Sequence, residues 1–171
     1  MIITFFGHST ISDEGKLFEK VLRILTLCID RERHVTFYCG GYGDFDRLCA
    51  RACRAIKKQF PLCNVAFVTP YITEAQQIKM RKMVESGLYD MCVYPPLENV
   101  PPRYAIARRN EWMAKEADLV LAYVKYRCGG AYQATERARQ RGKRVIQLAG
   151  LPGGVLTRSE SDGVPPFDLP S

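Results

Sequence analysis

The stretch HVTFYCGGYGDFDRLCARACRAIKKQF, residues 34–60, contains a strand, a tight turn and a helix in one run. HVTFYC (34–39) has the apolar character of a short strand, and GGYGDFD (40–46) supplies the glycines of a turn. The apolar residues that follow recur every three or four positions and predict an amphipathic helix. They are Phe45, Leu48, Cys49, Ala52, Ile56 and Phe60. The unit as a whole indicates an α/β fold.

The same unit recurs along the chain. IITFF (2–6) ends at Gly7 and precedes a helical pattern from Leu17 to Ile29. We predict further strands in 64–71, 90–96, 118–124 and 143–149, and further helices near 73–86, 103–117 and 131–141. Strands with continuous apolarity are typical of parallel sheets that are covered on both faces. The sequence therefore predicts a doubly wound, mostly parallel sheet of about six strands with helices on both faces, a Rossmann-like fold.

Length and composition favour one domain. The 171 residues, of which 47% are hydrophobic, suit a single Rossmann-like domain over residues 1–149. Residues 150–171 are rich in Pro and Gly, lack periodicity and are expected to form a C-terminal tail. The chain shows neither an apolar run that could span a membrane nor a signal peptide, which predicts a cytoplasmic protein without a membrane partner. The seven cysteines lack zinc spacing, so we expect reduced thiols and no metal.

The positive charge is concentrated in one segment. The net charge is +7, and residues 101–149 hold 11 Lys and Arg against 4 Asp and Glu. This excess suggests an anionic partner, either a small phosphate or the backbone of a nucleic acid. The alternative is a solvated helix surface, which we prefer for ERARQRGKR (136–144).

The candidate ligand site lies where the strands end. In an open parallel sheet, ligands bind at the carboxyl ends of the strands, where loops and helix N-termini converge. The expected ligand-binding residues are Gly7, His8, Gly40, Gly41, Tyr42, Gly43, Asp44, Asp46, Arg109, Asn110, Gly129, Gly130, Ala131 and Tyr132. Glycine-rich turns can cradle a phosphate or a sugar with main-chain donors, although GGYGDFD could equally be a tight turn with Asp44 as a helix cap. Asp44 and Asp46 would repel a phosphate, so ribose hydroxyls suit them better.

Arg109 is the most informative of these residues. It falls within or beside an expected inward stripe of Ile106, Met113 and Ala117. A buried arginine needs an anionic partner, and Glu136, Asp46 or a bound phosphate could serve. A plain internal salt bridge is the alternative, whereas Arg108 is expected to be exposed.

Glu136 and His8 each have two possible roles. Glu136 follows Gly129-Gly130 on the last helix and could act as a general acid or base, or accept a ribose hydroxyl. Its alternative is an exposed carboxylate that pairs with Arg139 or Arg108. His8 follows the first strand, and a capping or surface role is its alternative to ligand binding.

Three stretches carry a resemblance to a known family: strand-GGYGDFD-helix, ARRNEWMAKEADLVLAYV (107–124) and CGGAYQATERA (128–138). Together they resemble the SLOG superfamily of Rossmann-like proteins over about residues 1–149, and most closely its small bacterial and phage members. The superfamily includes the DNA-processing DprA proteins and the "lonely guy" phosphoribohydrolases. The resemblance implies a homodimer.

The resemblance to the phosphoribohydrolases can be followed residue by residue. It places Arg109 at the family arginine, Asn110 at a lysine and Glu136 at the catalytic glutamate. Cys128 stands where that family has proline, and Tyr132-Gln133 stand where it has Gly-Thr. These departures bear on hydrolysis more than on nucleotide binding.

The leading prediction is therefore binding of a nucleotide-like ligand, such as a nucleoside phosphate or an ADP-ribose-like signal, without a cofactor. The alternative is a nucleoside-monophosphate phosphoribohydrolase with Glu136 and Arg109 as catalytic residues. A third prediction is single-stranded DNA binding. It ranks last because residues 101–149 are expected to lack surface aromatic side chains among their basic residues.

Overall fold

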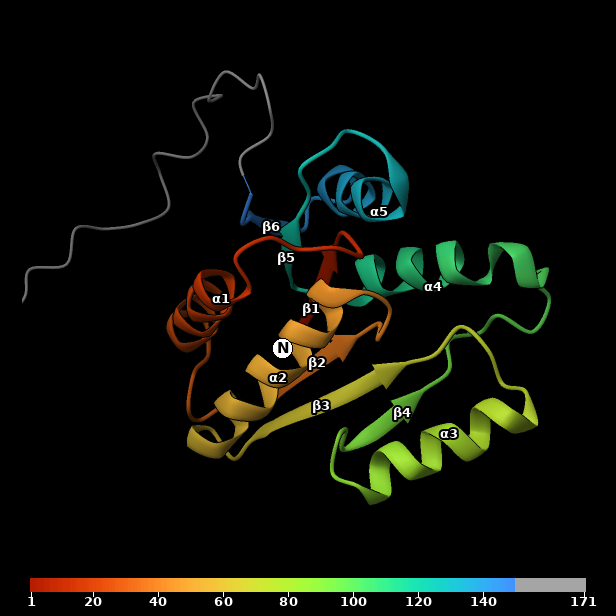
Figure 1. The fold of residues 1–171 in the computed structure, drawn as a ribbon, viewed down its shortest axis with the longest axis horizontal. Helices are drawn as coiled ribbons and strands as arrows, with labels where there is room; N and C mark the ends of the chain where they lie inside the picture. Colours follow the sequence, from red (N-terminus) through yellow and green to blue (C-terminus); the bar gives the residue numbers. More distant parts are fainter. Residues whose placement is uncertain (150–171) are drawn as a thin grey trace, which may run out of the picture.

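The computed structural model describes residues 1–149, which form a six-stranded parallel sheet in the order β4-β3-β2-β1-β5-β6 (Figure 1). The strands are β1 (Ile2–Gly7), β2 (Val35–Cys39), β3 (Cys63–Val68), β4 (Met91–Val93), β5 (Leu119–Tyr123) and β6 (Arg144–Gln147). Every pairing is parallel. The predicted doubly wound α/β fold is thus confirmed, while the expected tail at 150–171 lies outside the described residues.

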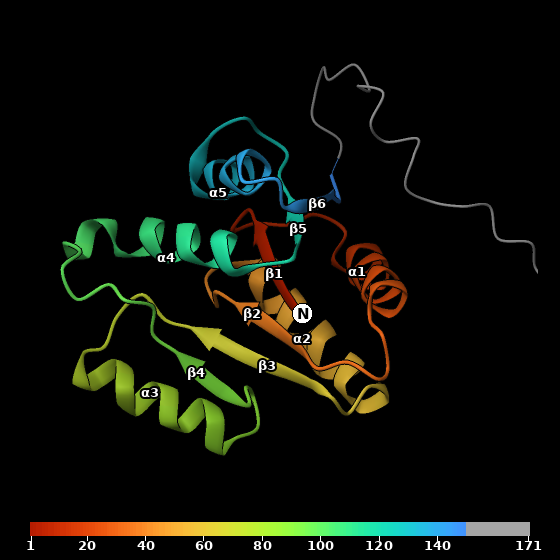
Figure 2. The ribbon, with the colours of Figure 1, turned by 180° about the vertical axis from the view of Figure 1, so that it is seen from behind.

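Five helices connect the strands and cover the sheet. They are α1 (Glu14–Cys28), α2 (Asp44–Gln59), α3 (Glu74–Glu85), α4 (Pro102–Glu116) and α5 (Gly129–Gln140). Helices α1 and α2 pack on one face, and α4 and α5 pack on the other (Figures 1 and 2). Helix α3 lies beside the β4 edge and has no buried residue. No described helix is long and apolar enough to cross a membrane.

The two faces of the sheet have different packing. In β1, Ile3 and Phe5 point to the α1 and α2 side, whereas Phe6 points to the α4 and α5 side. Side chains alternate in this way because successive residues of a strand face opposite sides. On the α4 and α5 side, the helices contribute mainly small buried residues, Ala114, Ala117, Ala134 and Ala138. Small side chains let these helices approach the sheet closely.

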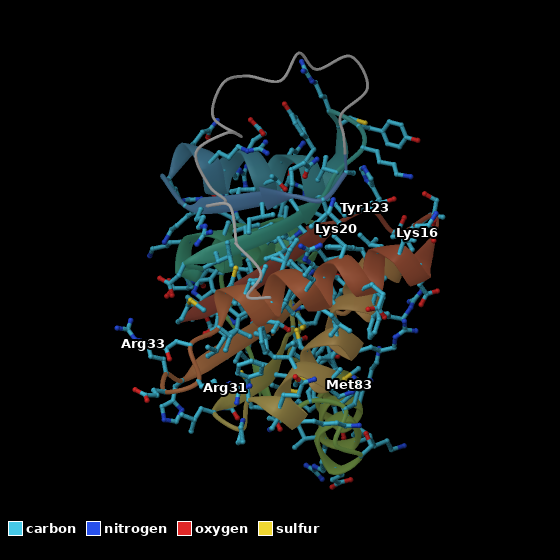
Figure 3. The ribbon with its side chains drawn as sticks, turned by 90° about the vertical axis from the view of Figure 1, so that its left-hand side faces the viewer. Lys16, Lys20, Arg31, Arg33, Met83 and Tyr123 are labelled. Atoms are coloured by element: carbon cyan, nitrogen blue, oxygen red, sulfur yellow. The ribbon has the colours of Figure 1, made fainter. Side chains whose placement is uncertain are left out.

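The side of the molecule at α1 is rich in exposed cations. Figure 3 labels Lys16, Lys20, Arg31 and Arg33 on this side. One of them has a structural role, because Lys20 Nζ donates a hydrogen bond of 2.9 Å to the carbonyl oxygen of Leu148, just after β6. Lys16 pairs with Asp13, the residue just before α1.

The buried face of α4 differs from the predicted stripe. Met113 and Ala117 are buried as expected, but Ile106 is 39% exposed and its place is taken by Ala105. The buried positions 105, 109 and 113 repeat every four residues, so Arg109 lies at the centre of the buried face rather than beside it. The α4 backbone therefore directs Arg109 toward the carboxyl ends of β2 and β3.

Candidate functional site

A cavity of about 330 Å³ opens at the carboxyl ends of β1, β2 and β5. Strand β1 lies between β2 and β5, and the helices that follow β1 and β5 leave toward opposite faces of the sheet. This is the topological switch point, where open α/β sheets bind their ligands. The cavity is lined by Phe5, Phe6, Gly7, His8, Ser9, Gly40, Tyr42, Asp46, Ile106, Arg109, Asn110, Met113, Gly129, Gly130 and Ala131.

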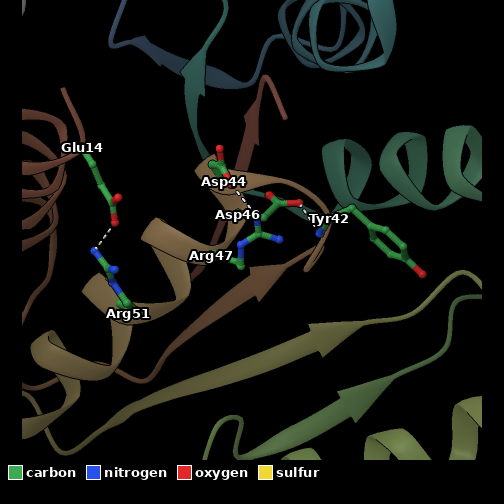
Figure 4. A network of polar contacts seen from close by, with 6 residues as sticks. All are labelled: Glu14, Tyr42, Asp44, Asp46, Arg47 and Arg51. Atoms are coloured by element: carbon green, nitrogen blue, oxygen red, sulfur yellow. Dashed lines mark hydrogen bonds and ion pairs between the residues drawn. The ribbon is translucent and has the colours of Figure 1, made fainter. Parts of the chain in front are cut away.

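The structure brings most of the expected ligand-binding residues to this cavity. Gly7, His8, Gly40, Tyr42, Asp46, Arg109, Asn110, Gly129, Gly130 and Ala131 line it. Gly41, Gly43, Asp44 and Tyr132 lie outside its lining. Asp44 instead pairs with Arg47 on the surface of α2 (Figure 4).

Arg109 lies at the floor of the cavity and is 2% exposed. Its Nη1 donates hydrogen bonds to the carbonyl oxygens of Gly40 at 2.7 Å and Val68 at 2.8 Å. The ring of Tyr42 lies 5.2 Å from the guanidinium carbon, which is a cation–π contact. Among the described residues, Nε of Arg109 has no hydrogen-bond partner. Arg109 thus fastens α4 to the ends of β2 and β3 while part of its donor capacity stays unused.

Asp46 is the acidic residue that accompanies Arg109. Its Oδ2 accepts a hydrogen bond of 2.9 Å from the backbone N–H of Tyr42 (Figure 4). Burial raises the pKa of Asp46 to about 6, against the opposing effects of Arg109, the Tyr42 N–H and Arg47. Among the described residues, Asp46 is the one carboxylate that lines the cavity. Of the partners expected for Arg109, Asp46 is therefore the one that the fold places nearby.

The N-terminus of α5 forms the opposite wall. Its N-cap residue, Cys128, makes no side-chain hydrogen bond to the helix, so the first N–H groups are left for another acceptor. Gly129 has φ = 85°, a left-handed conformation that favours glycine. A Cβ on Gly129 or Gly130 would meet no atom within 4 Å, so packing does not explain either glycine. A helix N-terminus with free N–H groups and open space before it attracts anions.

His8 lines the cavity but is engaged in holding a loop. Its Nε2 accepts hydrogen bonds from the backbone N–H groups of Lys125 at 2.7 Å and Tyr126 at 3.3 Å. Burial lowers the pKa of His8, and the neighbouring Lys125 lowers it further. Because Nε2 accepts these two hydrogen bonds, the ring proton lies on Nδ1. His8 thus has the capping role that was the alternative to ligand binding.

One exposed tyrosine lines the cavity and two others lie at the same edge of the sheet, and sequence reasoning missed those two. Tyr42 follows β2 and is 41% exposed, Tyr126 follows β5 and is 59% exposed, and Tyr104 in the first turn of α4 is 49% exposed. The expectation that residues 101–149 lack surface aromatic side chains is wrong. The sequence positions of Tyr104 and Tyr126 could have indicated this location. A residue just after a parallel strand, or at the start of the next helix, lies at the carboxyl edge of the sheet.

The charged residues of α4 and α5 pair largely with one another. Glu136 lies outside the cavity lining and its Oε1 is 2.5 Å from Nη1 of Arg139. Glu111 is contacted by three arginines, Arg108, Arg137 and Arg141, at 2.8 Å, 3.2 Å and 3.5 Å. Four arginines of 101–149 thus contact two glutamates, so most of the excess positive charge of this segment is not offset by these pairs.

No protein-family model matches the chain, and no curated protein matches its sequence. Solved structures of DNA processing protein A do match its fold. The protein from Streptococcus pneumoniae has a TM-score of 0.55 and 18% identity, with 90% of this chain and 51% of that chain covered. The protein from Helicobacter pylori has a described single-stranded DNA binding mode. Its TM-score is 0.58 at 11% identity, and the match covers 90% of this chain and 67% of that chain.

The chain spans about half the length of the Streptococcus protein. At these identities the likeness concerns the fold. The chain has a Rossmann-like α/β fold similar to that of DNA processing protein A.

Proposed function

We propose that this domain binds single-stranded DNA along the carboxyl edge of its sheet, with one nucleotide in the cavity at the switch point. The observation that carries the proposal is a single cavity lined by the open N-terminus of α5 and by the exposed Tyr42, with the exposed ring of Tyr126 packed against the lining residue His8. These groups match two features of any single strand, its phosphates and the aromatic faces of its bases.

The phosphate would lie at the N-terminus of α5. There, backbone N–H groups and the helix dipole favour an anion, and Gly129 and Gly130 leave space for it. Arg127, exposed in the loop before α5, adds a positive charge on the same side. This arrangement would bind any nucleotide, because a phosphate carries no base identity.

The bases would stack on tyrosine. A single strand exposes the faces of its bases, and proteins that bind it combine aromatic platforms with positive charge. Tyr42, Tyr104 and Tyr126 offer such platforms at the carboxyl edge. The fold of the Helicobacter protein, which binds single-stranded DNA, adds support. We infer from the same fold, together with the sequence resemblance, that the chain is a SLOG-type protein.

A free nucleoside phosphate or an ADP-ribose-like molecule is the second candidate. The observation that favours it is the cavity itself, since about 330 Å³ lies within the range of small-ligand sites. We do not propose phosphoribohydrolase activity, because Glu136 lies outside the cavity and pairs with Arg139. The homodimer implied by the resemblance stays a prediction for sedimentation analysis.

Fluorescence anisotropy with a labelled oligothymidine of about 20 nucleotides tests the proposal. We expect saturable binding that weakens as salt rises, because phosphate contacts release counterions. A duplex of the same length should bind less well, since its bases are already stacked. If AMP binds but the oligonucleotide does not, the second candidate replaces the first. Absence of binding to both ligands at low salt would reject the site.

A further inference from the structure

Two opposite charges at the floor of the cavity lie close together without touching. Nη2 of Arg109 and Oδ2 of Asp46 are each 3.1 Å from the point that a Cβ on Gly40 would occupy. The two atoms are therefore separated by no more than twice that distance, yet Arg109 and Asp46 form no ion pair among the described contacts. A gap of this size matches one bridging oxygen that makes a hydrogen bond on each side.

The backbone holds the two charges apart. Nη1 of Arg109 is fixed by the carbonyl oxygens of Gly40 and Val68, and Oδ2 of Asp46 is fixed by the N–H of Tyr42. These hydrogen bonds hold Nη1 and Oδ2 in place, because breaking one of them in a buried site is costly. Arg109 also keeps an unpartnered Nε although it is 2% exposed. The pair thus retains hydrogen-bonding capacity that the protein does not use.

The chemistry of the gap selects its occupant. The group between the residues must accept a hydrogen bond from the guanidinium and donate one to the carboxylate. A ligand hydroxyl does both and can replace a water molecule there, whereas a phosphate would be repelled by Asp46 and an ammonium group by Arg109. Both side chains line the cavity, so a ligand can reach the gap from there.

We infer that Asp46 and Arg109 bind a free sugar hydroxyl of the nucleotide in the cavity. This inference rests on the proposed function and specifies the nucleotide that the site accepts. An internal deoxynucleotide of a DNA strand has no free sugar hydroxyl, because its 3′ oxygen is esterified and its 2′ position carries none. The hydroxyl therefore comes either from a ribose or from the 3′ end of a strand. In both cases, the cavity selects a nucleotide by its sugar.

Four nucleotides that differ only in sugar hydroxyls distinguish these sources: AMP, 2′-deoxy-AMP, 3′-deoxy-AMP and 2′,3′-dideoxy-AMP. We expect the dideoxy compound to bind at least about tenfold more weakly than AMP, because it leaves two charged groups unbridged. If 2′-deoxy-AMP binds as weakly as the dideoxy compound, the site binds the 2′ hydroxyl; if 3′-deoxy-AMP does so, the site binds the 3′ hydroxyl. Oligothymidines that end in a 3′ hydroxyl or in a dideoxynucleotide extend the comparison to strand ends.

The variant D46N keeps the shape of the side chain and removes its charge, so it should reduce the preference for hydroxyls to nearly nothing. D44N is the matched control, because Asp44 belongs to the same turn but lies outside the cavity. The variant G40A offers a second test, since its Cβ would lie 2.9 Å from Nη1 and 3.1 Å from Nη2 of Arg109 and would obstruct the gap.

Equal affinity for all four nucleotides and for both oligonucleotides would overturn the inference and leave the proposed function intact. The inference is also overturned, with the proposed function intact, if D46N prefers nucleotides with sugar hydroxyls as strongly as the unmodified protein does. Absence of binding to every nucleotide and oligonucleotide would overturn the proposed function and the inference together. A circular dichroism spectrum of each variant checks that the fold is retained.

Discussion

Arg109 on α4 donates a hydrogen bond from Nη1 to the carbonyl oxygen of Val68, 2.8 Å away at the end of β3. The same nitrogen reaches the carbonyl oxygen of Gly40 after β2. A cation 2% exposed therefore joins one helix to two strands that are distant from it in sequence. The floor of the cavity depends on this connection, so Arg109 affects stability as well as binding.

Replacing Arg109 by alanine should destabilise the fold. The variant R109A leaves two carbonyl oxygens without their donor and the buried Asp46 without the positive charge beside it, which we expect to lower the free energy of unfolding by about 3–5 kcal/mol. Chemical denaturation measures this change. The control is R108A, because Arg108 is exposed and pairs with Glu111 at the surface, where such pairs contribute about 0–1 kcal/mol. Equal losses in the two variants would contradict the account of Arg109.

Removing the ring of Tyr126 should weaken binding of single-stranded DNA. Stacking of a base on an aromatic ring is worth about 1–3 kcal/mol, so Y126A should raise Kd by about 5-fold to 150-fold. Y126F keeps the ring and should bind nearly as well as the unmodified protein. Anisotropy with labelled oligothymidine checks both variants. Unchanged affinity in Y126A would remove Tyr126 from the interface.

His8 should make the fold less stable in mild acid. The pKa of His8 is lowered in the folded protein, so below its ordinary value of 6.5 the unfolded chain binds a proton more readily. The contribution of the neutral His8 to the free energy of unfolding is fully present above pH 6.5, and it is lost as pH falls through the lowered pKa. In H8A this loss should disappear, together with the hydrogen bonds to Lys125 and Tyr126. Thermal unfolding between about pH 5 and 7.5 measures the difference; identical pH profiles would contradict it.

Asp46 should make the fold more stable in mild acid, the opposite of the effect of His8. Its pKa is raised from 3.8 to about 6, so between these values the folded chain holds a proton that the unfolded chain has lost. The free energy of unfolding should rise as pH falls from above 6 toward 4. Arg109 and Arg47 are the positively charged groups that act on this carboxylate. D46N should abolish the rise, whereas D44N should retain it.

The fold was accessible from sequence because its signals are local. Apolar runs such as VTFYC, glycines at their ends and the helical spacing of Phe45, Leu48 and Cys49 each depend on a few neighbouring residues. The same periodicity placed Arg109 near the buried face of α4, and the carboxyl-end rule brought Gly7, Gly40 and Gly129 to one cavity. Connectivity of parallel strands then allowed few arrangements.

The remaining features depend on contacts between distant segments. The partners of Arg109 lie 69 and 41 residues away, and those of His8 lie 117 and 118 residues away, so no local pattern reveals them. The pairing of Glu136 with Arg139 is local, but whether α5 turns that face toward the cavity or the solvent depends on helix packing. The exposure of Ile106 and Tyr104 likewise follows from the rotation of α4.

The most direct test of the site is NMR of the backbone amides of Gly129 and Gly130 during titration with an oligothymidine. We expect chemical-shift changes at these two amides and at Tyr42 and Tyr126, and these changes should saturate with the same Kd as the anisotropy. Inorganic phosphate should move the two glycine amides and leave the tyrosine ring signals in place. Oligonucleotide-dependent shifts confined to other surfaces, such as the α1 cations Lys16 and Lys20, would contradict the central claim.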